Sequence, residues 1–206
     1  MLTVESYVAF AGCSVRLIRR LGFRMIKKNK DKTFDLSKLA IIGPGRLGTS
    51  MAYKFGRDDK EITIYHHDAE LCREINETRL NPKHLTKDLA RLMGGLDKVP
   101  RLSKKIAATN NLERVVEENH FIVLAITMNR LPELLDYVKP LIAKKKGKTC
   151  FISPIKGLTS DEKTRELITP SQMIDNAFFN IKSKYKIVCI GGPFFDVDIA
   201  TGKPVC

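Results

Sequence analysis

The chain has 206 residues, 43% hydrophobic and 29% charged, a balance that suits one folded α/β domain with its own core and some additional sequence. This length is too short for two full domains of ordinary size, and no apolar run approaches the roughly 20 residues of a membrane-spanning helix. Lys and Arg outnumber Asp and Glu by 36 to 23, but the excess is partly local and has no aromatic interleaving or nucleic-acid motif. We therefore expect neither integral membrane association nor a nucleic-acid partner.

The first 36 residues differ in character from the rest of the chain. If these residues form a helix, one of its faces is apolar and carries Tyr7, Ala11, Ile18, Leu21 and Met25. Most of the Arg and Lys residues lie away from that face. A basic amphipathic segment is typical of an organelle-import peptide or of a helix on an anionic membrane surface. An extension without a role beyond solubility is the third interpretation. We treat residues 1–36 as an extension of the domain at 37–206.

The five cysteines are scattered, with no CxxC pair and no His at the spacing of a zinc site. An odd number at irregular spacing is typical of a reducing compartment. We expect no metal site and a cytoplasmic location, with import into an organelle through residues 1–36 as the alternative.

From residue 37 on, apolar strands alternate with amphipathic helices. The expected strands are residues 38–43, 61–66, 105–109, 120–126, 149–153 and 186–190. The expected helices are 46–55, one capped by Asp68 and running to 75, 112–118, 131–143 and 162–168, with a surface excursion at 82–101 that contains a short helix. This alternation predicts βαβ units and a mostly parallel sheet with helices on both faces. Right-handed crossovers make it a doubly wound, Rossmann-type α/β fold.

A GxGxxG turn follows the first of these strands directly and opens a helix, and a second strand comes at βαβ distance. This context is what raises a weak motif to a prediction of a dinucleotide site. Gly43 permits the tight turn, Gly45 lets the backbone approach a pyrophosphate, and Gly48 allows close packing of helix and strand. The free N–H groups of the new helix then point at the anion.

Two further segments lie at the carboxyl ends of expected strands, where open α/β sheets bind ligands. His66-His67-Asp68 follows the second strand, where an acid favours NAD and a cation favours the 2′-phosphate of NADP; His67 can serve either purpose, so the choice stays open. Lys156 follows the fifth strand and is placed to meet an anionic or carbonyl-bearing substrate.

Several ordered stretches resemble the N-terminal domain of NAD(P)-dependent glycerol-3-phosphate dehydrogenase. They are IGPGRLGTSMA at 42–52, IYHHDAE at 64–70, INETRLNPKHL at 75–85, LAIT at 124–127, IKGL at 155–158, and GPFF at 192–195 leading into GKP at 202–204. The 75–85 stretch is the most specific of these, and it argues against a hydroxy-acid dehydrogenase that shares the first domain only.

The resemblance implies reversible reduction of dihydroxyacetone phosphate to glycerol 3-phosphate with NAD or NADP as cofactor, in glycerophospholipid and carbohydrate metabolism. It implies that Arg46 and Leu47 line the pyrophosphate turn and that His67 contacts the adenosine end. It also implies that Lys156 touches both cofactor and substrate and that the backbone of Gly192 helps to hold the substrate.

The sequence departs from the family at several of these places. Leu47 replaces an aromatic residue, Phe194 stands where a small hydroxyl residue commonly meets substrate, and Asp196 replaces an alanine beside the cofactor, where an acid should weaken binding by charge repulsion. The family's C-terminal helical domain, which carries its catalytic lysine, would follow Pro204. We therefore assign no catalytic residue here and expect the chain alone to be inactive. Its partner would then be a second copy of the chain, in a homodimer, or a helical domain supplied separately. The alternative function is that of a non-catalytic dinucleotide-binding module.

Overall fold

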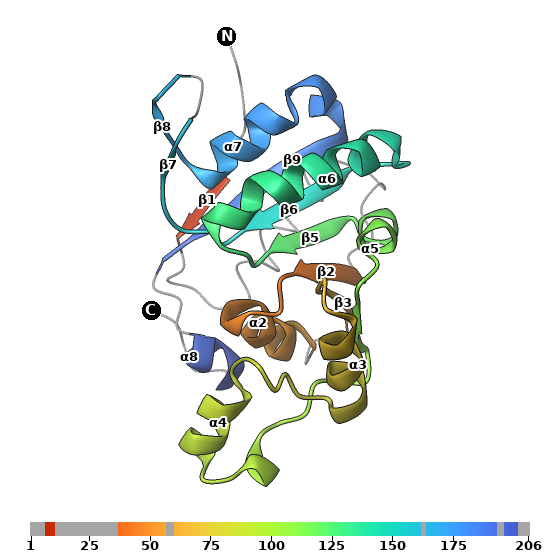
Figure 1. The fold of residues 1–206 in the computed structure, drawn as a ribbon, viewed down its shortest axis with the longest axis vertical. Coiled ribbons are helices and arrows are strands. Elements are labelled where there is room, and N and C mark those ends of the chain that lie inside the picture. Colours follow the sequence, from red (N-terminus) through yellow and green to blue (C-terminus); the bar gives the residue numbers. More distant parts are fainter. Residues whose placement is uncertain (1–6, 11–36, 57–59, 162–163, 193–195, 202–206) are drawn as a thin grey trace.

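The computed structural model describes residues 7–10, 37–56, 60–161, 164–192 and 196–201, and its main feature is a parallel sheet in the order β1-β9-β6-β5-β2-β3-β4 (Figure 1). Its strands are β1 (Tyr7–Phe10), β2 (Lys38–Ile42), β3 (Glu61–Tyr65), β4 (Ile106–Thr109), β5 (Phe121–Leu124), β6 (Thr149–Ser153) and β9 (Tyr185–Gly191). Every pair of neighbours runs parallel. The six expected strands are confirmed, with small shifts at their ends.

The chain builds this sheet outward in two directions from its middle. From β2 it moves to β3 and β4, then crosses back to β5 on the other side of β2 and continues to β6 and β9. The strand order therefore reverses between β2 and β5, which is where a doubly wound sheet opens a crevice for a ligand. The Rossmann-type fold that the sequence predicts is confirmed.

Helices cover both faces of the sheet. One face carries α2 (Arg46–Gly56), α3 (Ala69–Thr78), α4 (Thr86–Met93) and α8 (Asp196–Thr201), and the other carries α5 (Leu112–Glu118), α6 (Leu131–Lys144) and α7 (Pro170–Ala177). Short 3₁₀ turns are η1 (Leu96–Lys98), η2 (Met128–Arg130) and η3 (Phe179–Lys184). Among these described residues, no helix has the length and apolar character to cross a bilayer.

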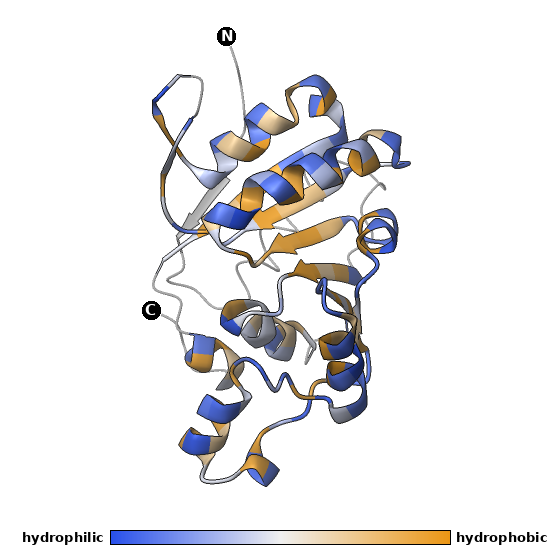
Figure 2. Ribbon diagram, viewed as in Figure 1, coloured by the Kyte–Doolittle hydropathy of each residue, from blue (hydrophilic) through white to orange (hydrophobic). Residues whose placement is uncertain are grey.

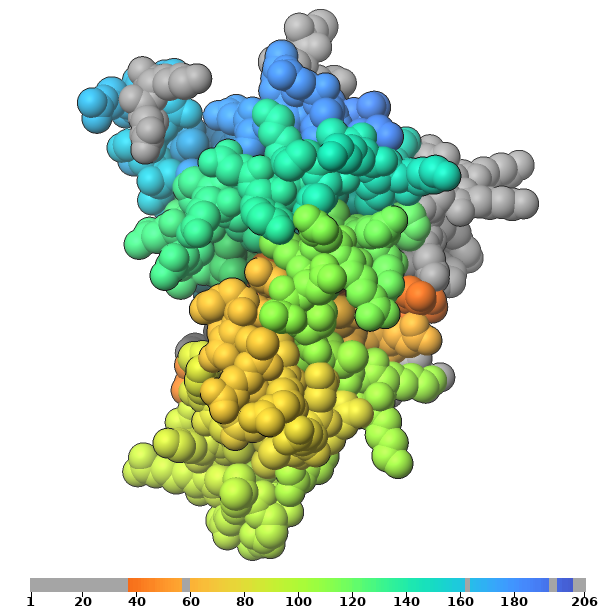
Figure 3. All heavy atoms as spheres, turned by 45° about the vertical axis from the view of Figure 1, so that its right-hand side comes forward, coloured from red at the N-terminus to blue at the C-terminus, as the bar shows by residue number. Residues whose placement is uncertain are grey.

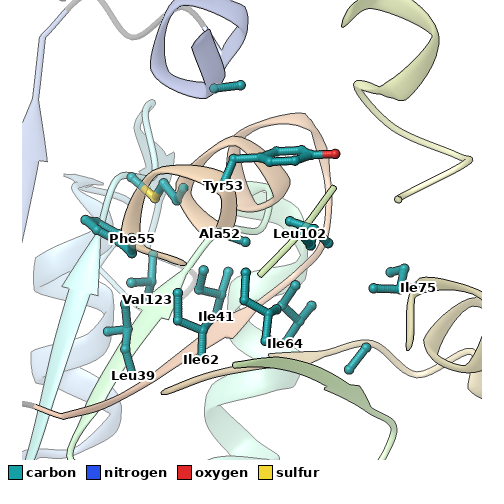
Figure 4. Close-up of a cluster of buried hydrophobic side chains, with 14 of the residues drawn as sticks. Leu39, Ile41, Ala52, Tyr53, Phe55, Ile62, Ile64, Ile75, Leu102 and Val123 are labelled. Carbon is teal, nitrogen blue, oxygen red and sulfur yellow. The ribbon is translucent and has the colours of Figure 1, made fainter. Parts of the chain in front are cut away.

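Successive residues of each central strand serve two different cores. In β2, Leu39 and Ile41 pack beneath α2 with Ile62 and Ile64 of β3 (Figure 4). Ala40 and Ile42 face α5 and α6 instead. The central strands β5 and β6 are thus largely apolar, and Figure 2 shows them as nearly continuous hydrophobic ribbons between helices of mixed character. This pattern is expected of a parallel sheet buried on both faces.

The helical prediction for the first 36 residues is wrong at residues 7–10. These residues form β1, which extends the sheet beyond β9 with Tyr7 opposite Val188 and Phe10 opposite Gly191. Four residues of one strand carry no periodicity that separates them from a helix turn. The other residues of 1–36 lie outside the described residues.

The helix expected at 162–168 is also wrong. The chain forms a small antiparallel pair there, β7 (Thr159–Ser160) with β8 (Leu167–Ile168), and Arg165 has a φ of +63°. The connecting residues are polar, so a helix would have no apolar face to bury. The helix α7 begins later, where Thr169 and Gln172 form a capping box around Pro170 at the first turn.

The excursion expected at 82–101 contains α4 and η1, as the sequence predicts, and forms the lower end of the face in Figure 3. Its residues Leu85 and Leu89, with Leu102 just beyond it, are buried against the core beneath α2. The excursion is therefore anchored to the domain and carries its polar residues to the neighbourhood of the glycine turn.

Candidate functional site

The glycine turn lies at the carboxyl end of β2, beside β5, where the strand order reverses. Gly43 has a φ of +98°, and a Cβ there would lie 2.5 Å from the Ala125 carbonyl oxygen that follows β5. A Cβ on Gly48 would lie 2.0 Å from the Gly43 carbonyl oxygen. Any side chain at either position would push the start of α2 away from the strand. The two glycines therefore have the packing roles that the sequence predicts.

Gly45 differs from its neighbours because a Cβ there would meet nothing within 4 Å. Packing does not require glycine at this position. The open space in front of its backbone fits a ligand that must approach closely, which is the role predicted for the second glycine of the motif.

The first turn of α2 presents amides without i→i−4 partners next to this space. The first i→i−4 hydrogen bond of the helix runs from Thr49 N to the Gly45 carbonyl oxygen at 2.9 Å, so the N–H groups of Arg46, Leu47 and Gly48 have no partner of that kind. No acidic residue belongs to that turn. Since the Leu47 side chain packs against the core, it can contribute to the turn through its backbone only. The arrangement fits a diphosphate.

A buried asparagine fixes the shape of the turn. Asn81 Nδ2 donates to the Pro44 carbonyl oxygen at 2.6 Å and to Thr49 Oγ1 at 2.8 Å. Its own Oδ1 accepts from the backbone amides of Lys83 and His84, both at 3.2 Å. The sequence predicts no role for Asn81, although this residue lies in the most specific stretch of the resemblance, because nothing local reveals a partner 37 residues away.

The Arg46 side chain bridges two acids from different elements. Its guanidinium pairs with Asp88 on α4 and with Asp196 at the start of α8. The contacts of the guanidinium with these carboxylates, first with Asp196 and then with Asp88, raise the pKa of Arg46. Asp196, expected to lie beside the cofactor as a repelling acid, thus has a cationic partner. The sequence does not predict the pairing with Asp88, because the two residues are 42 positions apart.

The residues after β3 lie beside the turn, since β3 is the neighbour of β2. His67 is exposed, and its ring lies tilted by 35° against that of His66, with 4.2 Å between the ring centroids. Burial lowers the pKa of His66, and His67 lowers it further. Asp68 caps α3 by accepting from the amides of Glu70 and Leu71, which confirms its predicted role.

Lys83 adds a cation at this strand end that the sequence did not predict. Its Nζ donates to Asp68 Oδ2 at 2.7 Å. This hydrogen bond, together with those from two backbone amides, lowers the pKa of Asp68 to about 2. The polar groups beyond β3 therefore include a histidine, a lysine and a carboxylate already engaged by both helix and lysine.

Lys156 and Gly192 occupy the same edge of the sheet, farther along it. Lys156 is exposed in the loop that follows β6, and Gly192, with a φ of +132°, comes directly after β9. The turn, His67, Lys156 and Gly192 thus all follow carboxyl ends of parallel strands. Phe194, the departure predicted to affect substrate contact, lies outside the described residues.

Comparison with known proteins identifies the sequence family. A sequence model described as "NAD-dependent glycerol-3-phosphate dehydrogenase N-terminus" matches residues 38–206. A glycerol-3-phosphate dehydrogenase [NAD(P)+] of Clostridium botulinum (strain Alaska E43 / Type E3) is 29% identical over 169 residues, covering 82% of this chain and 44% of the relative. The Bacillus subtilis (strain 168) enzyme of the same name is 25% identical over 174 residues, covering 82% of this chain and 43% of the relative.

Solved structures share the fold. A glycerol-3-phosphate dehydrogenase from Coxiella burnetii superposes with a TM-score of 0.62 at 18% identity, covering 80% of this chain and 43% of that one. The Plasmodium falciparum structure also gives 0.62, at 20% identity, covering 86% and 45%. The chain thus spans less than half the length of these relatives. The match of this family model over residues 38–206 shows that the chain belongs to the family of NAD-dependent glycerol-3-phosphate dehydrogenase N-terminal domains, which implies NAD(P) binding.

Proposed function

We propose that this chain is the cofactor-binding part of an enzyme that reversibly reduces dihydroxyacetone phosphate to glycerol 3-phosphate. The observation that carries the proposal is the turn at 43–48, where open space in front of Gly45 meets three helix N–H groups without i→i−4 partners. A diphosphate satisfies such amides and interacts favourably with the positive end of the helix dipole. We propose residues 37–206 as the binding domain and 1–36 as an extension of it, from which Tyr7–Phe10 adds the strand β1 to the sheet.

Each predicted site residue has a defined part in this proposal. The cofactor site consists of Gly43, Gly45, Arg46, Leu47, Gly48, His67 and Lys156, and the substrate site includes Lys156 and Gly192. The glycines supply backbone geometry, and the amides of Arg46 and Leu47 meet the diphosphate. His67 faces the adenosine end, next to Asp68, whose carboxylate pairs with the ammonium of Lys83. A bound nicotinamide would supply the hydride.

Reduction of the carbonyl also needs a proton donor for the developing alkoxide and a clamp for the substrate phosphate. Among the described residues of the substrate site, Lys156 is the one cation that the proposal offers for both tasks. We therefore propose that turnover depends on groups from a helical domain or a partner chain, and that the chain alone binds cofactor without turning over. We further propose that the protein acts in the cytoplasm.

Cofactor binding tests the proposal directly. Titrating the purified chain with NADH, followed by nicotinamide fluorescence and by calorimetry, should give saturable binding. Gly45→Ala should weaken it by about tenfold or more, because its methyl group enters the diphosphate space, while the melting temperature stays unchanged. Gly191→Ala is the matched control, since its methyl group also meets no atom within 4 Å but lies at the end of β9. Equal affinity of wild type and Gly45→Ala would refute the site.

Turnover separates the enzyme from the non-catalytic alternative. The chain, mixed with dihydroxyacetone phosphate and NADH, should leave the absorbance of NADH unchanged on its own and oxidise NADH once a helical domain of a relative is supplied. Binding without turnover in both cases would favour the non-catalytic module. The same titrations with NADPH decide the cofactor, since its 2′-phosphate would gain an interaction with Lys83, in competition with Asp68.

A further inference from the structure

Arg46 stands at the entrance of the proposed diphosphate site with both of its partners already in place. The guanidinium is bound by Asp196 from α8 and by Asp88 from α4, two elements that reach the first turn of α2 from separate parts of the chain. No sequence feature of the glycine turn requires this arrangement. It has a direct consequence for an anion that arrives at the same turn.

The local charge is unfavourable for such an anion. One guanidinium and two carboxylates leave a net charge of −1 next to the amides that would receive a diphosphate. The ligand, itself an anion, must therefore either approach two carboxylates or draw the guanidinium away from them. Either route lowers its affinity, because like charges a few ångströms apart at a protein surface repel appreciably.

The two carboxylates are not equivalent. The Asp196 side chain is 21% exposed, whereas those of Asp88 and Arg46 are 46% and 50% exposed. A less exposed charge is less screened by water and salt, so its effect on a neighbouring anion is stronger. Asp196 should therefore oppose the ligand more than Asp88 does.

We propose that Asp88 and Asp196 set the cofactor affinity of this chain by competing with the cofactor's diphosphate for the guanidinium of Arg46. The cation exchanges partners: it is held by the two acids in the free protein and by the diphosphate in the complex. This inference rests on the proposed cofactor site and adds two acidic residues, from α4 and α8, that determine how tightly that site binds.

Neutral isosteres test the competition. Asp196→Asn should tighten NADH binding by about tenfold, equivalent to about 1.4 kcal/mol, and Asp88→Asn by about threefold. The double variant should be tighter than either. Arg46→Gln should weaken binding by about tenfold, because both carboxylates then lose their compensating cation. Asp198→Asn is the matched control: it removes the same charge from α8 and should change affinity less than twofold.

Stability measured on the same variants separates competition from a structural tie. If the acids serve only to fasten α4 and α8 to α2, the Asn variants should lower the melting temperature and leave the affinity unchanged or weaker. Either affinity result would overturn the proposal.

Inorganic pyrophosphate separates this proposal from the proposed function, since it needs only the turn and Arg46. If NADH binds to no variant, the proposed function fails. The competition still holds in that case if the double variant binds pyrophosphate more tightly than wild type does. Equal pyrophosphate binding by the two proteins, or none by either, overturns it.

Discussion

The strands of the parallel sheet end at a carboxyl edge and begin at an amino edge. These two edges differ in how they bind a cationic side chain. At the carboxyl edge, Arg46 is half exposed and pairs with carboxylates of other elements. At the amino edge, Lys145 is buried, and its Nζ donates to the carbonyl oxygens of Val116 at 2.8 Å and Asn119 at 2.5 Å, near the end of α5. Backbone carbonyls cannot leave without unfolding the helix end, whereas carboxylates on separate elements can be exchanged for a phosphate. The first arrangement can be exchanged for a bound anion, whereas the second is fixed by the fold.

The largest effect that would sharpen this comparison comes from Gly48→Ala. The added methyl group would lie 2.0 Å from the Gly43 carbonyl oxygen, a backbone atom that cannot rotate away. We expect the free energy of unfolding to fall by about 3 kcal/mol, at the upper end of the usual cost of overpacking, with loss of NADH binding. Urea denaturation measures it. Unchanged stability would show that α2 does not need its close approach to the turn.

Asn81 is an exception to the difference between the two edges, because it lies at the carboxyl edge yet has mainly backbone partners. Asn81→Ala tests this exception. Truncation leaves the Pro44 carbonyl oxygen and two amides without it, so we expect a loss of about 2 kcal/mol. The exposed Asn129, changed to Ala, should cost less than about 0.5 kcal/mol in the same urea titration. Similar values for the two variants would contradict the role of Asn81.

Lys145, at the amino edge, should make the free energy of unfolding depend on pH. Burial lowers the pKa of its ammonium group to about 8 from an ordinary value of 10.5. Between these two pH values the unfolded chain holds more protons than the folded one, so the free energy of unfolding rises with pH across this interval and levels off above it. Lys145→Met should lack this rise. Parallel curves for wild type and variant, measured by urea denaturation from about pH 7 to about pH 11, would refute it.

The sequence predicts the strands and the glycine turn because their signals are local. Gly43, Gly45 and Gly48 mark the turn within six residues, and the central strands β5 and β6 are apolar runs that a doubly wound sheet buries on both faces. The prediction of a helix at 162–168 is wrong because the charged residues there are not accompanied by an apolar stripe that a helix could bury. The stronger local signal is the capping box from Thr169 to Gln172, which begins α7.

The rest of the candidate site has no such local signal. The ion pair from Arg46 to Asp88 joins positions far apart in the sequence, so it exists only once α4 has been anchored by Leu85 and Leu89. Asn81 likewise finds its partners only after the chain has folded back to the turn. Local chemistry predicts where a diphosphate would bind, and only tertiary structure shows which side chains surround that place.

The smallest expected effect concerns Asp68, a carboxylate of the carboxyl edge that joins a structural role to an exposed ion pair. The hydrogen bond from Lys83, with those from the α3 amides, lowers its pKa to about 2 from an ordinary 3.8. Its contribution to stability is therefore fully present above about pH 4 and is lost as the pH falls towards 2. Asp68→Asn keeps a good helix cap but has no charge to titrate. Urea denaturation at about pH 5 and about pH 3 should show a larger decline for wild type than for the variant, and added salt should narrow the gap because the pair with Lys83 is exposed. If the difference in decline between wild type and variant persists unchanged in about 1 M salt, the two backbone amides of α3, and not Lys83, stabilise the carboxylate. The contacts of Asp68 would then resemble the fixed backbone contacts of Lys145 more than the exposed ion pairs of Arg46.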